Sequence, residues 1–403
     1  MHTSRLLLAA LLAAALVAAP AQGVVSTEAP AALLVFPLIS VDSSAGVDTL
    51  IQLTNTDEAA VGVRCDYQEP TGRPEFRAFD LQLAANQPVA WHAAAGRAAD
   101  AVGAVPALGS GPFTGVLRCA ATGAVGAPAA RNVLIGDATI QRSSNTPSLA
   151  IDASHYNATG FDALDGALNG DPQLTLGGAA AEYAACPQSL LFQTFFDGAT
   201  LELGADGSVQ HMLSTTLALA SCAQRTTEDS NATISVVVTN ELGTMTSTIV
   251  ALHEQLVTPI SLIDTAAPDR SIFSFAVQQT LTGTIRLTPV SGTGALAVAL
   301  QHHADVSDAT RAGSVAIQPQ LEGERSTADV IDLPPVTPTA APACAGDCDG
   351  DGRAEINELV TGVNIALDIQ AISACPAFDR DMSGTVSIGE LIVAVNNALR
   401  GCP

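Results

Sequence analysis

Short apolar runs separated by turn-forming residues fill the chain from residue 24 to residue 325. The runs are rich in Val, Leu, Ile and Thr and are punctuated by Gly, Pro, Asn and Asp, which is typical of short strands without long helices. The sequence therefore predicts a mainly β fold of antiparallel β-sandwiches. The expected strands are residues 32–40, 49–54, 61–67, 79–83, 88–92, 115–121, 132–141, 189–196, 212–220, 233–239, 247–252, 272–278, 283–287 and 297–302.

A weak internal repeat divides this region in two. Leu-Ile-Gln-Leu-Thr-Asn at 50–55 is echoed by Val-Val-Val-Thr-Asn at 236–240. Thr-Gly-Val-Leu-Arg at 114–118 is echoed by Thr-Gly-Thr-Ile-Arg at 282–286. We therefore expect two related β-sandwich domains, residues 24–160 and 161–325, with their boundary in the Gly-, Ala- and Asp-rich stretch 157–185.

Two segments of different composition flank the β region. Residues 6–19 form an apolar run that follows Arg5 and precedes small residues, which predicts a secretory signal peptide over residues 1–23. The run is shorter than the roughly 20 residues that span a bilayer. Residues 326–343 contain four prolines and predict an extended, semi-rigid linker to a tail module, residues 344–403. We expect an exported protein that is secreted, periplasmic or held at the cell surface, with no membrane span.

Net charge and composition limit the classes of partner that the protein can bind and the residues that can form its cores. The net charge is −24 and all 16 basic residues are Arg, so the chain repels nucleic acid and anionic lipid. Aromatic residues make up only 4% of the chain, so its cores must consist mainly of Ala, Val, Leu and Ile.

Eight cysteines in an exported chain favour disulfides over metal thiolates. Pairing within sequence neighbourhoods predicts Cys65–Cys119 and Cys186–Cys222. The four tail cysteines allow three pairings, and we favour Cys344–Cys402 with Cys348–Cys375, because the two ends of a paired-loop module lie close together.

The tail carries one 12-residue loop twice, at residues 347–358 and 379–390, 32 positions apart. Calcium loops supply oxygen ligands at positions 1, 3, 5, 7, 9 and 12 and need Gly at position 6, where Gly352 and Gly384 stand. The sequence therefore predicts two bound Ca²⁺ ions. The candidate ligands are Asp347, Asp349, Asp351, the Arg353 carbonyl, Glu355 and Glu358 in the first loop, and Asp379, Asp381, Ser383, the Thr385 carbonyl, Ser387 and Glu390 in the second.

The two loops differ in charge. The first brings five carboxylates and the second three, so we expect the first to bind Ca²⁺ more tightly. Without metal the carboxylates of the first loop repel one another, so metal binding should be linked to folding of the tail.

An apolar helix is expected after each loop. Leu359, Val363 and Leu367 recur at helical spacing, and so do Leu391, Val395 and Leu399. We expect these two stripes to bury each other. Ala354 and Val386, at loop position 8, should pair the loops in a short β-bridge.

The tail resembles a type I dockerin-like module, which is a tandem EF-hand pair in which each calcium loop is followed by one helix. The resemblance covers residues 344–403 and implies that the loop positions given above are the metal ligands. It also implies docking onto a cohesin-like or other cell-surface protein. Cohesin-reading dockerins often carry a Ser/Thr pair at loop positions 10 and 11, where this chain has Ile356-Asn357 and Ile388-Gly389. Position 12 is Glu, where dockerins usually have Asp.

No catalytic motif stands out in the sequence. There is no nucleophile elbow, P-loop, dinucleotide fingerprint or His-Glu-x-x-His helix, and His253-Glu254 lacks a second His. His302-His303-Ala-Asp305 could be half of a metal site, but neighbouring strand residues point to opposite faces.

The remaining candidates have simpler interpretations. The single Trp, Trp91, could stack on a sugar but is more often a core residue. Asp162 and Asp165 lie near the domain boundary without further context. We therefore predict no catalytic residue and no cofactor other than Ca²⁺.

Three functions agree with this sequence. The first is an exported, non-catalytic calcium-binding protein, whose tail binds Ca²⁺ for stability or attachment and whose β domains bind a surface, glycan or protein. The second is a dockerin-bearing extracellular enzyme of polysaccharide breakdown. The third is a structural surface spacer. The low aromatic content and the missing motifs favour the first.

Overall fold

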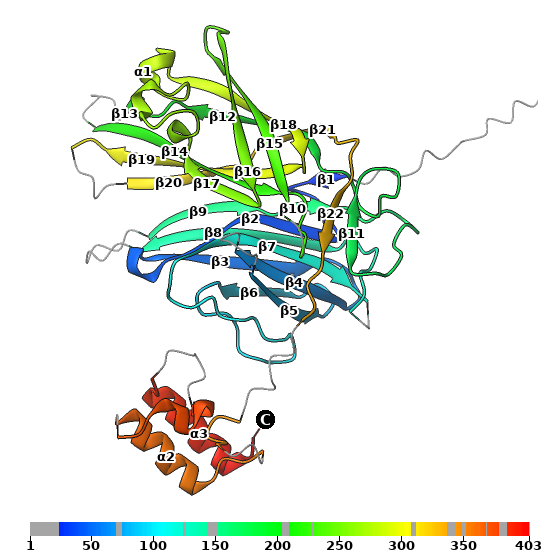
Figure 1. Ribbon diagram of the computed structural model, residues 1–403, viewed down its shortest axis with the longest axis vertical. Helices are drawn as coiled ribbons and strands as arrows, with labels where there is room; N and C mark the ends of the chain where they lie inside the picture. The colour runs from blue at the N-terminus through cyan, green and yellow to red at the C-terminus, as the bar shows by residue number, and fades with distance from the viewer. Residues whose placement is uncertain are drawn as a thin grey trace, which may run out of the picture.

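The computed structural model describes residues 24–69, 75–123, 126–143, 151–203, 209–226, 229–307, 312–336, 344–348, 352–367, 369–378 and 385–402. These residues form a mainly β structure of antiparallel sheets, with short helices at the C-terminal end of the chain (Figure 1). The prediction of a mainly β antiparallel fold followed by a small helical part is confirmed. The four larger sheets are arranged like the blades of a four-bladed β-propeller.

Each larger sheet takes strands from one half of the β region. Sheet 1 has the order β1 (Val25–Ser26), β10 (Thr159–Phe161), β2 (Leu33–Val41), β7 (Phe113–Thr122), β4 (Val61–Glu69) and β5 (Glu75–Leu83). Sheet 2 has the order β6 (Pro88–His92), β3 (Val47–Asn55), β8 (Leu134–Ser143) and β9 (Ile151–Asn157). Sheet 3 has the order β16 (Met245–His253), β15 (Asn231–Asn240), β18 (Thr282–Gly292), β12 (Pro187–Phe195) and β21 (Gln320–Glu324). Sheet 4 has the order β13 (Thr200–Leu203), β14 (Val209–Ser221), β19 (Ala295–Asp305) and β20 (Ala312–Ile317), and β17 (Gln255–Pro259) also pairs with β14.

The smaller elements connect these sheets or belong to the tail. A separate ribbon pairs β11 (Gln173–Leu176) with β22 (Asp329–Asp332). The 3₁₀ turns are η1 (Ser43–Ala45), η2 (Ile260–Leu262), η3 (Pro268–Arg270), η4 (Ile372–Ala374) and η5 (Pro376–Phe378), and the helices are α1 (Phe275–Gln278), α2 (Ile356–Ala366) and α3 (Ile388–Arg400). Among the described residues, no helix is both long enough and apolar enough to cross a bilayer.

The two halves of the β region share one strand order. The order β10-β2-β7-β4-β5 in sheet 1 corresponds, strand by strand along the chain, to β21-β12-β18-β15-β16 in sheet 3. Likewise β6-β3-β8-β9 corresponds to β17-β14-β19-β20. The Thr-Gly-x-x-Arg echo falls on the equivalent strands β7 and β18, but the other echo falls on β3 and β15, which are not equivalent. Only the first echo therefore follows the topology.

The central strands of sheet 4 are buried on both faces, because the sheet packs against neighbours on two sides. Leu217 and Leu219 of β14 belong to a core shared with sheet 3. The intervening Ala218 and Ala220 belong to the core formed mainly by sheets 1 and 2. The unbroken apolar run of β19 follows from the same packing. One apolar core thus extends from the first half of the chain into the second.

A buried polar network also joins the two halves. Arg118 of β7 is 1% exposed, and its guanidinium donates to Gln68 Oε1, to Gln224 Oε1 and to the Ser221 carbonyl at 2.9 Å. Gln224 Nε2 in turn donates to Asp66 Oδ2 at 2.8 Å. The network holds the two halves in one relative position, because its residues come from both halves and none of them can exchange its partner for water.

All four predicted disulfides are present: Cys65–Cys119, Cys186–Cys222, Cys344–Cys402 and Cys348–Cys375. They are consistent with an exported protein. The proposed signal peptide, residues 1–23, lies outside the described residues.

Two local predictions are wrong. Residues 272–278 form a turn and α1 rather than a strand, because side chains take the backbone N–H groups that a strand would donate. Asp264 accepts from Ile272 N at 3.0 Å, and Ser274 Oγ accepts from Val277 N at 3.3 Å. Residues 329–332 were expected in the linker but form β22, which pairs with β11 inside the expected boundary stretch.

Candidate metal centre

The first loop is closed by a buried glutamate. Glu358 is 6% exposed, and its carboxylate accepts from Cys348 N at 2.7 Å and from Glu355 N at 2.8 Å. Gly352 has φ +86°, which favours glycine, and its N–H donates to Asp347 Oδ2 at 2.8 Å. Loop positions 1 and 6 are thus hydrogen-bonded to each other, and positions 2 and 9 are hydrogen-bonded to Glu358 in the first turn of α2.

The second loop ends in the same way. Glu390 is 7% exposed, and its Oε2 accepts from Ser387 N at 2.8 Å and from Ser387 Oγ at 2.9 Å. Ser387 Oγ accepts in return from Glu390 N, which completes a capping box at the start of α3. Glu355 and Glu358 form the equivalent box at the start of α2.

The described residues hold part of the predicted ligand set. Asp347, Arg353, Glu355, Glu358, Thr385, Ser387 and Glu390 lie within them, whereas Asp349, Asp351, Asp379, Asp381 and Ser383 lie outside. Asp347 and Glu358 hold backbone N–H groups of the same loop, so the loop bends around hard oxygen donors. That donor chemistry fits Ca²⁺.

The predicted contact between the helix stripes holds only at its first positions: Leu359 and Leu391 pack against the buried core of the tail, but the later positions of both stripes do not. Val363 and Leu367 are 44% and 63% exposed, and Leu399 is 77% exposed. The helices meet instead around Phe378, which is fully buried, and a Cβ added at Gly362 would lie 2.3 Å from its ring. Residues four apart drift around a helix of 3.6 residues per turn, so a stripe at that spacing leaves the core side.

The expected β-bridge between the loops is also missing. Ala354 and Val386 are each 7% exposed and therefore buried. Across the part of the tail that the structure describes, however, no bridge joins them.

The exposed apolar residues of the two helices form matching rows. We call the two sets the exposed rows. They share the spacing i, i+4, i+7, i+11, and one is the other shifted by 32 positions. The rows are Ile356, Val360, Val363 and Leu367 on α2, and Ile388, Ile392, Val395 and Leu399 on α3, each between 43% and 79% exposed. Apolar surface arranged in this repeated way is typical of an interaction site.

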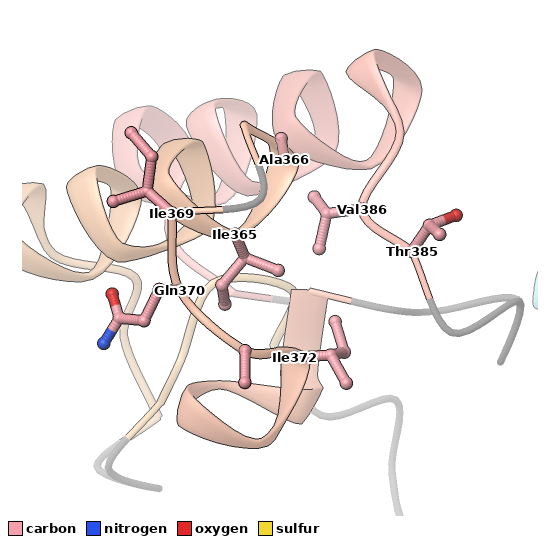
Figure 2. A pocket seen from close by; sticks show the side chains of 8 residues that line it. Ile365, Ala366, Ile369, Gln370, Ile372, Thr385 and Val386 are labelled. Atoms are coloured by element: carbon pink, nitrogen blue, oxygen red, sulfur yellow. The ribbon is translucent and has the colours of Figure 1, made fainter.

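A pocket of about 440 Å³ lies between the C-terminal end of α2, the segment that follows it, and positions 7 and 8 of the second loop (Figure 2). Ile365, Ile369, Ile372 and Val386 line it together with Thr385, a predicted ligand. Most of the lining side chains are aliphatic, but more of the exposed pocket surface is polar than apolar, so the lining does not single out one class of ligand.

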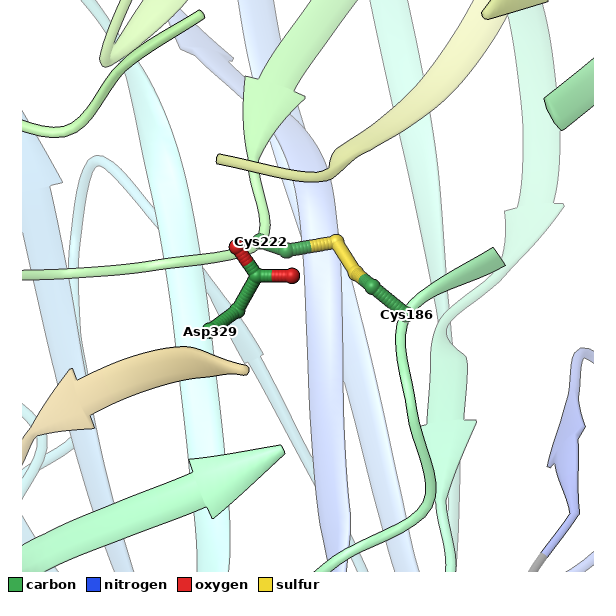
Figure 3. A group of neighbouring side chains, drawn as sticks. All are labelled: Cys186, Cys222 and Asp329. Carbon is green, nitrogen blue, oxygen red and sulfur yellow. A yellow bond between two sulfur atoms is a disulfide. The ribbon is translucent and has the colours of Figure 1, made fainter. Parts of the chain in front are cut away.

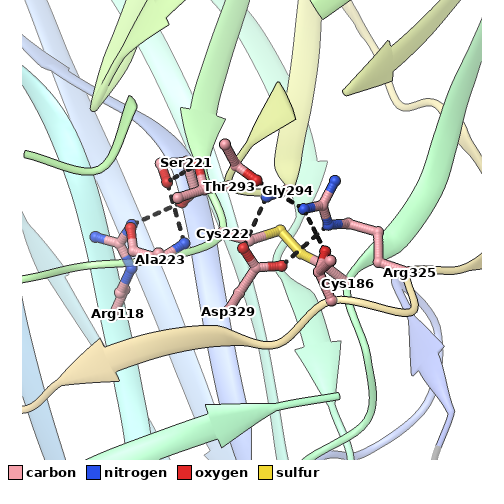
Figure 4. Close-up of a disulfide and its surroundings, with 11 residues drawn as sticks. Arg118, Cys186, Ser221, Cys222, Ala223, Thr293, Gly294, Arg325 and Asp329 are labelled. Carbon is pink, nitrogen blue, oxygen red and sulfur yellow. Dashed lines mark hydrogen bonds and ion pairs between the residues drawn. A yellow bond between two sulfur atoms is a disulfide. The ribbon is translucent and has the colours of Figure 1, made fainter. Parts of the chain in front are cut away.

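A second group of metal-ligating residue types lies in the β region. Cys186, Cys222 and Asp329 are buried, with ligand atoms within 4.8 Å of one another (Figure 3). The two sulfurs form a disulfide, so they are not thiolate ligands. Gly294 N donates to Asp329 Oδ1 at 2.8 Å and Arg325 Nε lies 3.3 Å from Asp329 Oδ2 (Figure 4). Burial raises the pKa of Asp329. The disulfide, the hydrogen bond and the ion pair therefore give this group a structural role.

No common site gathers Trp91, His253-Glu254 and Asp162. Trp91 is 3% exposed and its Nε1 donates to Tyr67 Oη at 2.6 Å, so it is a core residue and does not stack on a sugar. Glu254 accepts from Gln68 in the buried network, while His253 Nδ1 lies 3.0 Å from Asn231 Oδ1. Asp162 Oδ2 accepts from Val24 N at 3.0 Å near the start of β1.

Sequence reasoning missed the exposed rows. Ile356 and Ile388 depart from the dockerin pattern. The signal that could have predicted the rows is the 32-residue shift, because it relates the rows as well as the loops. No protein-family model matches this chain, and neither does any curated protein.

Proposed function

We propose that this is an exported, non-catalytic calcium-binding protein that attaches to a protein partner through its tail. In this proposal the tail is a dockerin-like EF-hand pair that holds two Ca²⁺ ions. The observation that carries the proposal is the duplication of the exposed rows, each of which starts two residues before the buried glutamate of its loop. Within each repeat, the proposed metal-binding loop therefore leads directly into the helix that carries the exposed apolar surface.

The proposed ligands are the twelve loop positions predicted from the sequence. Bound Ca²⁺ would supply positive charge that offsets the repulsion among the loop carboxylates. Glu358 and Glu390 orient the loop ends by holding backbone N–H groups at the start of each helix. Through these hydrogen bonds, Ca²⁺ binding in each loop would affect the helix that carries the exposed row.

The proposed partner is a folded cell-surface protein with an apolar patch, such as a cohesin-like domain. Burial of one large apolar side chain contributes roughly 1.5–3 kcal/mol, so four per row can support specific docking. The net charge of −24 disfavours an anionic membrane as the occupant. The β region would then be the part of the protein that the tail holds at the cell surface.

We further propose that the β region consists of two related β-sandwich domains that bind a surface, glycan or protein. The shared strand order of sheets 1 and 2 with sheets 3 and 4 supports a duplication. Sheets 1 and 2 share one core and sheets 3 and 4 share another, which supports one sandwich in each half; in this proposal the sandwiches pack against each other through sheet 4, which produces the propeller-like arrangement of four sheets.

Calcium titration of the full chain tests the metal sites. We expect two binding events by calorimetry, the tighter one lost in Glu358→Gln and the weaker one in Glu390→Gln. Glu28→Gln, an exposed change in the β region, is the control and should bind like the parent. Two unchanged events in both loop variants would refute the assignment.

Binding to immobilised cohesin domains, in Ca²⁺ and in EDTA, tests attachment. We expect calcium-dependent retention that is lost in the double variant Ile356→Ser, Ile388→Ser. Ile249→Ser, at an exposed isoleucine of β16, should be retained. Calcium-binding protein that is never retained, or rows that instead make the chain dimerise in the ultracentrifuge, would contradict docking and favour the spacer function.

A further inference from the structure

Two histidines and an aspartate share one face of sheet 4. In the β14–β19 ladder His211 lies directly opposite Asp305, and Leu213 lies directly opposite His303. Directly opposed residues point to the same face of a sheet, and so do residues two apart along one strand. His211, His303 and Asp305 therefore form a triangle on the face that, further along, carries Leu217 and Leu219 into the core shared with sheet 3.

The two imidazoles are already close. Their ring centroids are 6.5 Å apart with an interplanar angle of 65°. Two imidazole nitrogens on one metal ion, each at about 2.1 Å, place the centroids roughly 5–6 Å apart. The ligand atoms of His211, His303 and Asp305 do not all lie within 4.8 Å of one another in this structure, so binding one ion requires side-chain rotation.

The surroundings allow that rotation. Gly313 lies opposite His303 on β20, and a Cβ added there would have its nearest neighbour 4.0 Å away. Both histidines are only partly buried, which leaves a route for an ion from solvent.

A metal ligand needs a ring nitrogen that no hydrogen bond already occupies. His211 Nδ1 is shielded from solvent and has no hydrogen-bond partner within the described parts of the chain. A shielded nitrogen of this kind is stabilised by any ligand that reaches it.

Asp305 is held in place at the end of β19. It is 4% exposed, and its Oδ1 accepts from Ser307 N at 2.8 Å and from Ser307 Oγ at 2.7 Å. Hydrogen bonds of this kind orient a ligating carboxylate. The next residues inward are also polar, since Gln301 Nε2 donates to Thr194 Oγ1 at 3.1 Å. The end of the sheet is thus a polar cap on an apolar core.

We propose that His211, His303 and Asp305 bind a divalent transition-metal ion of the Zn²⁺ class. Imidazole nitrogen suits Zn²⁺ or Cu²⁺, whereas Ca²⁺ takes oxygen ligands, so this site is chemically distinct from the tail loops. Three protein ligands leave a fourth position for solvent or a small ligand. The ion would also pin the ends of β14 and β19 together.

Zn²⁺ calorimetry on the full chain in excess Ca²⁺ tests this site. We expect one Zn²⁺ site whose Kd rises at least about 100-fold in His211→Ala and in His303→Ala, the upper end of what loss of an outer-shell partner causes. His302→Ala is the matched control, because His302 points to the opposite face of the same strand, where its Nδ1 contacts Ser314 Oγ at 2.6 Å. It should bind Zn²⁺ like the parent.

Cu²⁺ electron paramagnetic resonance gives an independent reading. The parent should show coupling to two imidazole nitrogens, and each of the two ligand variants should show one fewer. Metal-free thermal unfolding of the variants reports whether they remain folded. The proposal is overturned if the parent has no Zn²⁺ site in excess Ca²⁺, or if folded His211→Ala and His303→Ala bind Zn²⁺ as the parent does.

Discussion

Arg118 and Arg286 occupy equivalent positions in the two halves but have opposite environments. Both close the Thr-Gly-x-x-Arg sequence, on β7 and β18. Arg118 is fully buried among Gln68, Gln224 and backbone carbonyls, whereas the Arg286 side chain is 44% exposed and pairs with Glu322. A buried cation must be matched by polar partners, whereas an exposed pair is screened by water.

The two arginines should therefore differ strongly in their contribution to stability. We expect Arg118→Met to lower the free energy of unfolding by about 3–5 kcal/mol, because it leaves Asp66 and its partners without their cation. Arg286→Met should lower it by about 1 kcal/mol or less. Urea denaturation of both variants measures the difference, and equal effects would show that the buried network does not hold the halves together.

Buried aspartates should make the protein more stable in mild acid. Burial raises the pKa of Asp197 to about 6 from 3.8, although Thr215 N donates to its Oδ1 at 2.7 Å. The folded state therefore holds this proton more tightly, and the resulting stability is fully present below about pH 4 and is lost as pH rises through about 6. Asp66 has a pKa raised to about 6 for the same reason.

Denaturation midpoints at pH 4.5 and pH 7 test this sign. We expect Asp197→Asn to reduce the change between the two values. Asp57→Asn should leave that change as it is in the parent. Hydrogen bonding to Arg131 lowers the pKa of Asp57, so its contribution to the pH dependence of stability falls below about pH 4. An unchanged pH dependence in Asp197→Asn would contradict the assignment.

At the scale of elements, the tail helices are spaced by one aromatic ring. Phe378 fills the gap beside Gly362 of α2, so the helices cannot approach through larger residues there. The later residues of both predicted stripes are therefore turned to the surface, where they belong to the exposed rows, whereas Leu359 and Leu391 pack against the tail core.

Gly362→Ala should destabilise the tail even though alanine favours helix. The added methyl group meets the Phe378 ring, and overpacking costs about 1–3 kcal/mol against a propensity gain of about 0.5–1 kcal/mol. In α3, Gly389→Ala meets only Ser387 Oγ at 3.7 Å and should be stabilising. Thermal unfolding followed by circular dichroism compares them, and a stabilising Gly362→Ala would mean that Phe378 does not occupy that space.

At the scale of the molecule, one core and one polar network cross between the halves of the β region. Ala218 and Ala220 of β14 pack into the core of sheets 1 and 2, and Gln224 reaches Asp66. Elements that share a core unfold together. We therefore expect one calorimetric transition for the β region, with equal van't Hoff and calorimetric enthalpies. Two separate transitions for the β region would show that the halves are independent.

Much of the fold could be predicted from the pattern of residues. Strand 88–92 agrees with β6 residue for residue, and the other predicted strands, except 272–278, overlap observed ones. Short strands such as β13 and β17 were missed, because four or five residues are too few for a distinctive hydrophobic period, and both strands pair with β14. Two cysteine pairs were predictable because each had one partner in its own third of the chain, and the tail pairs were predictable because the two ends of a paired-loop module lie close together. The calcium-loop assignment remains a prediction from spacing and residue type.

The sequence by itself determined the local features: which segments extend, where turns fall, which cysteines pair, and how the tail loops repeat. Strands and turns depend on near neighbours along the chain, and the cysteine groups and the loop repeat are visible as patterns in the residues themselves. Only the tertiary structure decided that Arg118 is buried while Arg286 is exposed, and that the helix rows face solvent. It also decided that His211 joins His303 and Asp305, which lie more than 90 positions away in the chain. Such relations depend on strand register and packing, which no short stretch of sequence specifies.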